Sequence, residues 1–310
     1  MKLVNLHGRP SLVRDDGHVD IERVSEGLFP SFEAVFNHWT AFRDWADTDR
    51  TSPVPSQAPL GPAVPRPQQV FGVGFNYAAH VTEAAAHIST SAGPPPLPLI
   101  FTKFPSPITG PTDDIELPNE TGDYEVELVV VIGTRADRLR VENAWSHVAG
   151  LAVGQDISSR GVQFLGPEQH TVGKSFRAFA PIGPYLVTPD ELADPTNLMM
   201  SCWINGDLRQ KSTTSEMIYN VAELVALLSA VTPLESGDLI FTGTPEGVGG
   251  LENPPRYLVA GDLIISEIEG LGRMENRCRT AAPGAGLRPA LAPLSPVPAL
   301  SGPSRIDHVN

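Results

Sequence analysis

The chain has 310 residues, a length that allows one or two domains with a large hydrophobic core. Its formal net charge of −14 argues against nucleic-acid binding, because contacts to a phosphate backbone need clustered lysine and arginine. Two cysteines are too few for a fold stabilised by several disulfides, and they indicate a reducing compartment. No signal peptide is apparent and no apolar run reaches the length of a membrane span, so we expect a cytoplasmic protein with no membrane partner.

The first 67 residues predict a small N-terminal domain that ends in a linker. Short strands are expected over residues 1–6 and 11–13, and a helix around residues 32–45. Residues 51–68 are rich in proline, which is typical of a linker. A larger domain is therefore expected over residues 68–280.

The larger domain opens with a strand, a turn and a helix over Phe71-Gly-Val-Gly-Phe-Asn-Tyr-Ala-Ala-His80-Val-Thr-Glu83, with Asn76 as the expected helix cap. His80 and Glu83 are three residues apart and would share one helix face. Such a pair can orient and deprotonate a water molecule. The alternative is a surface ion pair on an alanine-rich helix.

Two acids, Glu125 and Glu127, precede the continuous apolar run 128–132. Side chains two apart in a strand point to the same face, and such a run indicates a strand buried on both faces. Buried carboxylates are costly when unpaired, and a hard divalent cation with oxygen ligands resolves that cost. A solvated edge strand is the alternative.

A second apolar run, residues 148–155, predicts another buried strand, and it ends in Asp156. An aspartate at the end of a strand often caps the next turn or helix. Beside Glu125 and Glu127 it would instead supply a third oxygen ligand and leave metal positions open, as in a catalytic metal site.

The rest of the larger domain contains many strands bounded by glycine and proline, and few helices. One helix, expected over residues 217–228, has apolar residues near helical spacing, which favours a place in the core or at a subunit interface. Residues 281–310 are rich in proline, alanine and glycine and predict a disordered tail. The fold class predicted is mainly β with a few helices (α+β).

Together these segments resemble the fumarylacetoacetate hydrolase family, particularly its acylpyruvase-like bacterial branch. The resemblance runs in order from about residue 68 to residue 279, some two thirds of the chain. Any one motif would be weak, but the ordered set is specific. The matching motifs are Gly74-Phe-Asn-Tyr-Ala-Ala-His-Val-Thr-Glu83, Phe101-Thr-Lys-Phe-Pro-Ser106, Asp123-Tyr-Glu-Val-Glu127, Gln155-Asp-Ile-Ser-Ser-Arg-Gly-Val-Gln163, Gly173-Lys-Ser-Phe176, Ile204-Asn-Gly-Asp-Leu-Arg-Gln210, Gly237-Asp-Leu-Ile-Phe-Thr-Gly-Thr-Pro-Glu-Gly-Val-Gly249 and Gly261-Asp262.

The resemblance implies a distorted β-roll or barrel of mixed sheets for the catalytic domain, and a homodimer. It also implies a role for each matching residue. The implied metal ligands are Glu125, Glu127 and Asp156, for Mg²⁺ or Mn²⁺ with Ca²⁺ as a further candidate; the implied catalytic residues are His80, Glu83 and Lys174; and the implied substrate-binding residues are Arg160, Gln163 and Thr244.

The predicted function is a metal-dependent hydrolase that cleaves a carbon–carbon bond in a small β-diketone acid of the acylpyruvate or fumarylacetoacetate type. The His80–Glu83 pair would activate water, and Lys174 would stabilise the oxyanion or protonate the departing enolate. A decarboxylase, hydratase or isomerase of a 2-oxo acid would share that metal-bound enolate, so these outcomes stay open. A specialised biosynthetic enzyme and a non-catalytic binding protein are further alternatives.

Overall fold

The computed structural model describes residues 1–14, 17–49, 51–56, 58–85, 97–165 and 169–282, and the expected tail therefore lies almost wholly outside the described residues. Most of the regular structure is β. The strands of the largest sheet are β1 (Lys2–Leu6), β2 (Arg9–Arg14), β3 (Gly17–Asp20), β4 (Val70–Gly74), β5 (Leu99–Thr102), β6 (Ile108–Thr109), β9 (Val126–Ile132), β10 (Val148–Gln155), β12 (Ala180–Val187) and β15 (Leu239–Phe241). Their order is β3-β2-β1-β12-β10-β9-β15-β4-β5, and β6 pairs with β12.

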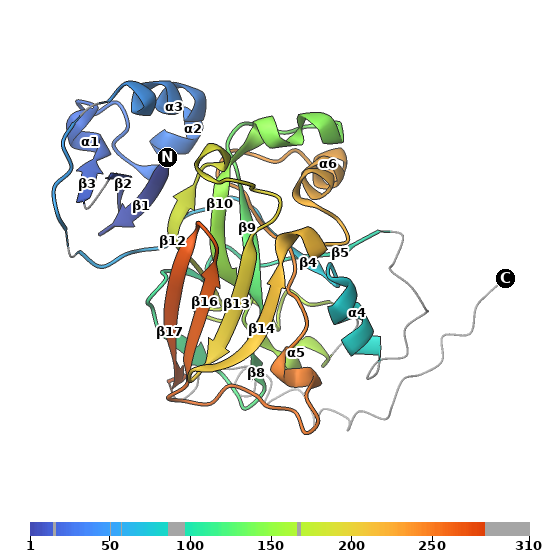
Figure 1. The fold of residues 1–310 in the computed structure, drawn as a ribbon. Helices are drawn as coiled ribbons and strands as arrows, with labels where there is room; N and C mark the ends of the chain where they lie inside the picture. Colours follow the sequence, from blue (N-terminus) through green and yellow to red (C-terminus); the bar gives the residue numbers. More distant parts are fainter. Residues whose placement is uncertain (15–16, 50, 57, 86–96, 166–168, 283–310) are drawn as a thin grey trace, which may run out of the picture.

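A second sheet packs beside the first and has the order β14-β13-β16-β17-β7 (Figure 1). Its strands are β7 (Ile115–Leu117), β13 (Met199–Ile204), β14 (Asp207–Thr213), β16 (Leu263–Ile268) and β17 (Gly272–Thr280). A short third pair joins β8 (Gly122–Asp123) to β11 (Ser158–Ser159).

The described helices are short. They are α1 (Ile21–Val24), α2 (Phe32–Asn37), α3 (Trp39–Thr48), α4 (Ala78–Ala85), α5 (Arg160–Gln163) and α6 (Val221–Val231), with 3-10 turns η1 (Val141–His147), η2 (Pro189–Glu191), η3 (Thr214–Glu216) and η4 (Gly249–Leu251). The mainly β class with few helices is confirmed. Within the described part of the chain, no helix combines the length and the apolar character that crossing a membrane requires.

Strand β9 lies between β10 and β15, and every residue of it is buried, as the apolar run predicts. Its two faces meet different partners. Leu128 and Val130 belong to the core cluster shared with the second sheet, whereas Val129 and Val131 belong to the cluster under the N-terminal helices. Because side chains alternate, Glu127 falls on the same face as Val129 and Val131. Glu125 and Glu127 therefore lie at the start of a strand whose remaining residues are packed on both faces.

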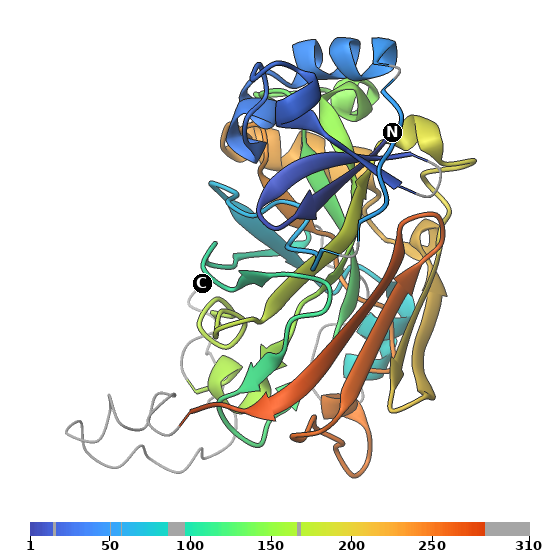
Figure 2. The ribbon, with the colours of Figure 1, turned by 90° about the vertical axis from the view of Figure 1, so that its left-hand side faces the viewer.

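The N-terminal strands extend the large sheet, because β1 pairs antiparallel with β12 (Leu3↔Leu186). Figures 1 and 2 show these strands and α1 to α3 at the end of the molecule far from β8 and α5. The single helix expected around residues 32–45 is wrong: His38 leaves helical geometry (φ −125°, ψ 37°) and separates α2 from α3. The boundary at residues 67 and 68 stays a prediction.

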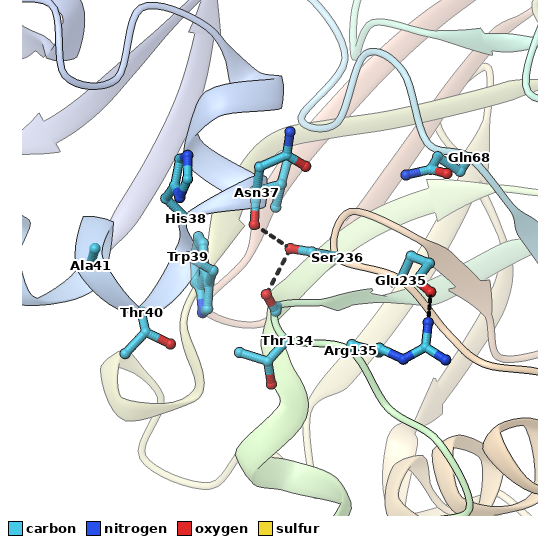
Figure 3. Close-up of a pocket in the computed structure, with 12 residues that line it drawn as sticks. Asn37, His38, Trp39, Thr40, Ala41, Gln68, Thr134, Arg135, Glu235 and Ser236 are labelled. Atoms are coloured by element: carbon cyan, nitrogen blue, oxygen red, sulfur yellow. Dashed lines mark hydrogen bonds and ion pairs between the residues drawn. The ribbon is translucent and has the colours of Figure 1, made fainter.

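A surface pocket of about 460 Å³ lies where the N-terminal helices meet the large sheet (Figure 3). The Ser236 hydroxyl is 2.6 Å from the Phe36 carbonyl and 2.7 Å from the Gly133 carbonyl, which ties the two parts together. The lining includes none of the site residues predicted above. We assign this pocket to the seam between the two parts of the fold.

The helix expected over residues 217–228 begins later, at Val221, because Asn220 caps it. The Asn220 side chain accepts from the Glu223 N–H, and the Glu223 carboxylate accepts from the Asn220 N–H, which forms a capping box. Leu224, Val225 and Leu228 are buried in the core, where the helical spacing places them.

Candidate active site

Three buried carboxylates converge where β9 begins and β10 ends. The strands are antiparallel with Val126 opposite Gln155, so the residues just outside each strand lie together, and the Asp156 N–H donates to the Glu125 carbonyl at 2.9 Å. One oxygen from each of Glu125, Glu127 and Asp156 lies within 4.8 Å of the others. These three residues are no more than 5% exposed.

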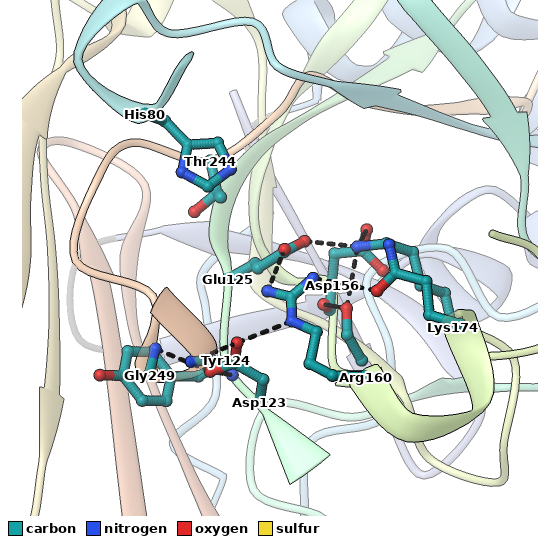
Figure 4. Close-up of polar contacts among 12 residues, drawn as sticks. His80, Asp123, Tyr124, Glu125, Asp156, Arg160, Lys174, Thr244 and Gly249 are labelled. Atoms are coloured by element: carbon teal, nitrogen blue, oxygen red, sulfur yellow. Dashed lines mark hydrogen bonds and ion pairs between the residues drawn. The ribbon is translucent and has the colours of Figure 1, made fainter. Parts of the chain in front are cut away.

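Two lysines contact this carboxylate cluster. The Lys174 ammonium donates to Glu125, to Asp156 Oδ2 at 2.7 Å and to Ser158 Oγ at 2.8 Å (Figure 4). The Lys103 ammonium donates to Asp156 Oδ1 and to the backbone carbonyl of Lys174. Both oxygens of Asp156 therefore bond to ammonium groups.

Arg160, the first residue of α5, approaches the cluster from another side. Its guanidinium donates to Asp123 Oδ2 at 2.8 Å, to Glu125 Oε1 at 2.6 Å and to Gln163 Oε1 at 3.1 Å. Asp123 also accepts from the backbone N–H groups of Gly249 and Gly250. Arg160 thus connects Glu125, a predicted metal ligand, with Gln163, a predicted substrate-binding residue.

Charge is nearly balanced in this buried group. Asp123, Glu125, Glu127 and Asp156 are four carboxylates, and Lys103, Arg160 and Lys174 are three cations, which leaves one unmatched negative charge. Burial raises the pKa of Glu125, but Lys174 and Arg160 outweigh that effect and hold it below its ordinary value. Burial, together with Asp156 and Glu125, raises the pKa of Glu127 well above its ordinary value.

This imbalance and the donor set fit a hard divalent cation. Three carboxylate oxygens within reach of one another are the ligands that Mg²⁺ and Mn²⁺ prefer. The excess negative charge falls on Glu127, whose Oε2 accepts only a backbone N–H, that of Gly243, at 2.8 Å among the described residues. A cation bound here would offset that charge.

The predicted dyad forms on α4. His80 Nδ1 lies 3.1 Å from Glu83 Oε2, and both oxygens of Glu83 accept from the Gly247 N–H, at 3.1 and 3.2 Å. Gly247 has φ +95°, and a Cβ there would lie 2.1 Å from the Arg209 carbonyl, so only glycine brings this N–H to Glu83. His80 is 7% exposed and stacks on Phe75, whereas the Glu83 side chain is 25% exposed, so the pair lies at the edge of the interior.

The expected cap of α4 is wrong. Asn76 instead accepts from the Tyr219 N–H at 2.8 Å and donates to the carbonyls of Tyr219 and Thr242. The side chain thereby fixes the turn before α4 to two distant loops. His80 is held near the carboxylates by these long-range contacts.

Thr244 follows β15, and Figure 4 draws it on the other side of Glu125 from Lys174. Its hydroxyl donates to the Val126 carbonyl at 2.9 Å and accepts from the Gln210 amide at 2.8 Å. The hydroxyl is thus occupied by the protein, and Thr244 holds the loop after β15 against β9.

The fold therefore brings together all nine residues predicted for the site. Sequence reasoning assigned no role to Lys103 or to Asp123, although both lie in motifs quoted above. Gln155 was missed as well: it accepts from the Glu125 N–H at 2.8 Å and donates to Ser266 at 2.9 Å. For Lys103, Asp123 and Gln155, the only feature of the sequence that indicates a place in the site is the family motif that contains each residue.

Residues 69–279 match the family model of the fumarylacetoacetate (FAA) hydrolase C-terminal domain. Oxaloacetate tautomerase Fahd2a, mitochondrial, of Rattus norvegicus is 42% identical over 224 residues, which cover 72% of this chain and 70% of the relative. A Mycobacterium smegmatis structure with the provisional name HpcE is 45% identical, with a TM-score of 0.86 over 91% of this chain and all of that chain. Maleylpyruvate hydrolase of Sphingobium sp. SYK-6, solved with manganese(II) and pyruvate, is 28% identical, with a TM-score of 0.74 over the same shares.

A mainly β fold with a buried acidic centre and a histidine–glutamate pair beside it defines a class of enzymes that act on small molecules. The chain belongs to the fumarylacetoacetate hydrolase family, as the resemblance implied. Its similar proteins carry the names of tautomerases, isomerases and hydrolases, so membership establishes an enzyme family and leaves the reaction open. The name of the rat relative places that protein in mitochondria, and a cytoplasmic location for this chain stays a prediction.

Proposed function

We propose that this protein is a divalent-metal-dependent enzyme that interconverts the enol and keto forms of an oxaloacetate-type 2-oxo acid. The observation that carries the proposal is the hydrogen-bonded pair of His80, which is buried, and Glu83, which is partly buried, with His80 near Glu125 of the carboxylate cluster (Figure 4). Tautomerisation moves one proton between carbon and oxygen, and it needs a base near the carbon and positive charge near the oxygen.

Sequence similarity supports this outcome over hydrolysis, which the sequence motifs placed first. Relatives named oxaloacetate tautomerase are 40–44% identical to the chain over 214 to 224 residues. The matched family region, residues 69–279, contains every residue of the proposed site. The maleylpyruvate hydrolase structure is less similar, at 28% identity.

In the proposed reaction, written in the keto-to-enol direction, His80 takes a proton from the carbon next to the 2-oxo group, and the resulting imidazolium delivers that proton to the 2-oxo oxygen. Glu83 orients the imidazole through Nδ1 and stabilises its charged form. The hydrogen bonds from Gly247 to Glu83 hold the pair in place before substrate arrives. Delivery of the proton to the oxygen leaves His80 neutral again, so the reaction moves one proton within the substrate and consumes no other reactant; ketonisation is the same sequence in reverse.

Positive charge for the anionic substrate comes from Lys174 and Arg160, which lie at the edge of the carboxylate cluster. Glu125, Glu127 and Asp156 would hold Mg²⁺ or Mn²⁺, and a bound ion would supply further positive charge that polarises the 2-oxo group. With a divalent ion present, the four carboxylates and three cations would carry one net positive charge. That balance favours an anionic substrate.

Hydrolysis of an acylpyruvate is the second candidate, because the same His80–Glu83 pair can activate water for attack on a carbonyl. A similar solved structure carries the name maleylpyruvate hydrolase and contains manganese(II) and pyruvate, which supports this candidate. The two candidates differ in the first step: His80 takes its proton from carbon in tautomerisation and from water in hydrolysis, which then breaks a carbon–carbon bond.

The test follows enol absorbance after enol oxaloacetate is mixed with catalytic amounts of protein and Mn²⁺, against Mn²⁺ alone. We expect the protein to accelerate ketonisation, and His80→Gln to lower kcat by a factor on the order of 10² to 10⁴. His38→Gln, an exposed histidine on the N-terminal unit, is the matched control. A rate no faster than Mn²⁺ alone, together with release of pyruvate from an acylpyruvate, would favour hydrolysis.

A further inference from the structure

Lys103 is a fully buried lysine just after β5, and the reaction proposed above does not use it. Its side chain has no exposed surface, and its ammonium lies 5.9 Å from the centre of the Phe241 ring. Removing an ammonium from water costs several kcal/mol unless other groups replace its hydration. Burial and the neighbouring Lys174 lower the pKa of Lys103, while Asp156 acts in the opposite direction.

Two hydrogen bonds replace that hydration, and they connect segments that are far apart in sequence. Lys103 donates to Asp156 Oδ1 across 53 positions and to the Lys174 carbonyl across 71 positions. Asp156 is a proposed metal ligand, and Lys174 carries the ammonium proposed to face substrate. One buried group therefore sets the position of both.

The two lysines contact different oxygens of Asp156, which indicates that they have different roles. Lys103 bonds to Oδ1, whereas Lys174 bonds to Oδ2 and also to Glu125. Oδ2 therefore lies on the side of Glu125, and Oδ1 lies on the side of the fully buried Lys103. A carboxylate held by its rear oxygen has one orientation, which is the usual role of groups behind a metal ligand.

We propose that Lys103 is a positioning residue for the metal centre: it orients Asp156 for the cation and fixes the backbone that carries Lys174. The proposal rests on the metal site of the proposed function. The competing role is charge balance alone, in which Lys103 merely offsets the carboxylates. The two roles predict opposite signs for metal affinity, because a nearby cation repels a divalent ion and a positioning group strengthens its binding.

The experiment is calorimetric titration of metal-free protein with Mn²⁺, without substrate. Lys103→Met keeps the length of the side chain but removes the donor and the charge, and we expect affinity for Mn²⁺ to fall about 10- to 100-fold. Lys103→Gln keeps a donor without the charge and should lie between Met and wild type. Lys211→Met, at an exposed lysine on β14, is the matched control and should equal wild type.

Wild-type affinity or tighter binding in Lys103→Met would overturn the positioning role and leave charge balance. Thermal unfolding in chelator checks that both variants fold. Failure of both to fold would assign Lys103 to fold stability and would also overturn the proposal. Wild-type protein that binds no Mn²⁺ would instead contradict the proposed function, so the two failures are distinguishable.

Discussion

Replacing Glu127 by Gln should stabilise the metal-free protein while removing metal binding. Glu127 is 2% exposed and faces two like charges, Glu125 and Asp156, within 4.8 Å. At an effective dielectric constant of about 20, each pair at that distance repels by about 3 kcal/mol. Lys174 offsets part of this repulsion, so we expect Glu127→Gln to raise the free energy of unfolding by about 1 to 3 kcal/mol at neutral pH.

The effect of Glu127→Gln on the free energy of unfolding should depend on pH. The pKa of Glu127 in the folded protein lies well above its ordinary value of 4.5, so the folded state binds the proton more tightly than the unfolded chain. The stability that this adds is fully present below pH 4.5 and is lost as the pH rises through the folded-state pKa. The advantage of Glu127→Gln over wild type should therefore vanish at low pH and grow as the pH rises.

The assay is urea denaturation in chelator at several pH values, repeated with Mn²⁺. Saturation at 100 times the dissociation constant stabilises wild type by about 2.7 kcal/mol, and the variant should gain almost nothing. Glu267→Gln, an exposed glutamate on β16, is the control and should follow wild type throughout. A Glu127→Gln protein that is less stable than wild type in chelator at neutral pH would refute the charge argument.

Three further predictions address the proposed site and assembly. Chelator-treated protein should lose activity and regain it with Mg²⁺ or Mn²⁺, whereas full turnover after verified metal removal would contradict a metal requirement. Glu83→Gln should lower kcat on the order of 10²- to 10⁴-fold. Affinity for Mn²⁺ should change little, because Glu83 contacts His80 and not the carboxylate cluster. Turnover at the wild-type rate would show that Glu83 has no part in proton transfer. Light scattering at micromolar concentration should give the mass of a homodimer, and the mass of a 33.2 kDa monomer would exclude it.

The acidic end of β9 could be predicted from sequence because its signals are local. The apolar run 128–132 indicated a buried strand, and alternation placed Glu125 and Glu127 on one face before any fold was known. The run 148–155 likewise predicted β10, with Asp156 at its end. The sequence patterns alone did not predict the antiparallel pairing that brings the two ends together, since that register is set by residues from distant strands.

Errors arose where a local signal competed with a distant contact. Asn76 has the residue type and position of a helix cap, but Tyr219 and Thr242 occupy its amide instead. On either side of the break at His38, Phe36 and Trp39 both pack into the core beneath the large sheet, with ring centres 5.8 Å apart. For Asn76, long-range contacts outweighed a capping preference worth about 1 kcal/mol.

Lys103 and Asp123 show a different limit. A lone lysine or aspartate in a sequence is usually solvated, and nothing in the neighbouring residues marks these two as buried. Each becomes informative only through its partner: Lys103 through Asp156, and Asp123 through Arg160. The residues that hold metal ligands in place are thus harder to predict than the ligands themselves. A set of metal ligands repeats a known chemical pattern. The residues that support those ligands depend on which distant segments the fold brings next to them. Metal affinity in Lys103→Met is for that reason a sharper probe of this site than activity, since activity alone would not separate a misplaced ligand from a missing acid or base.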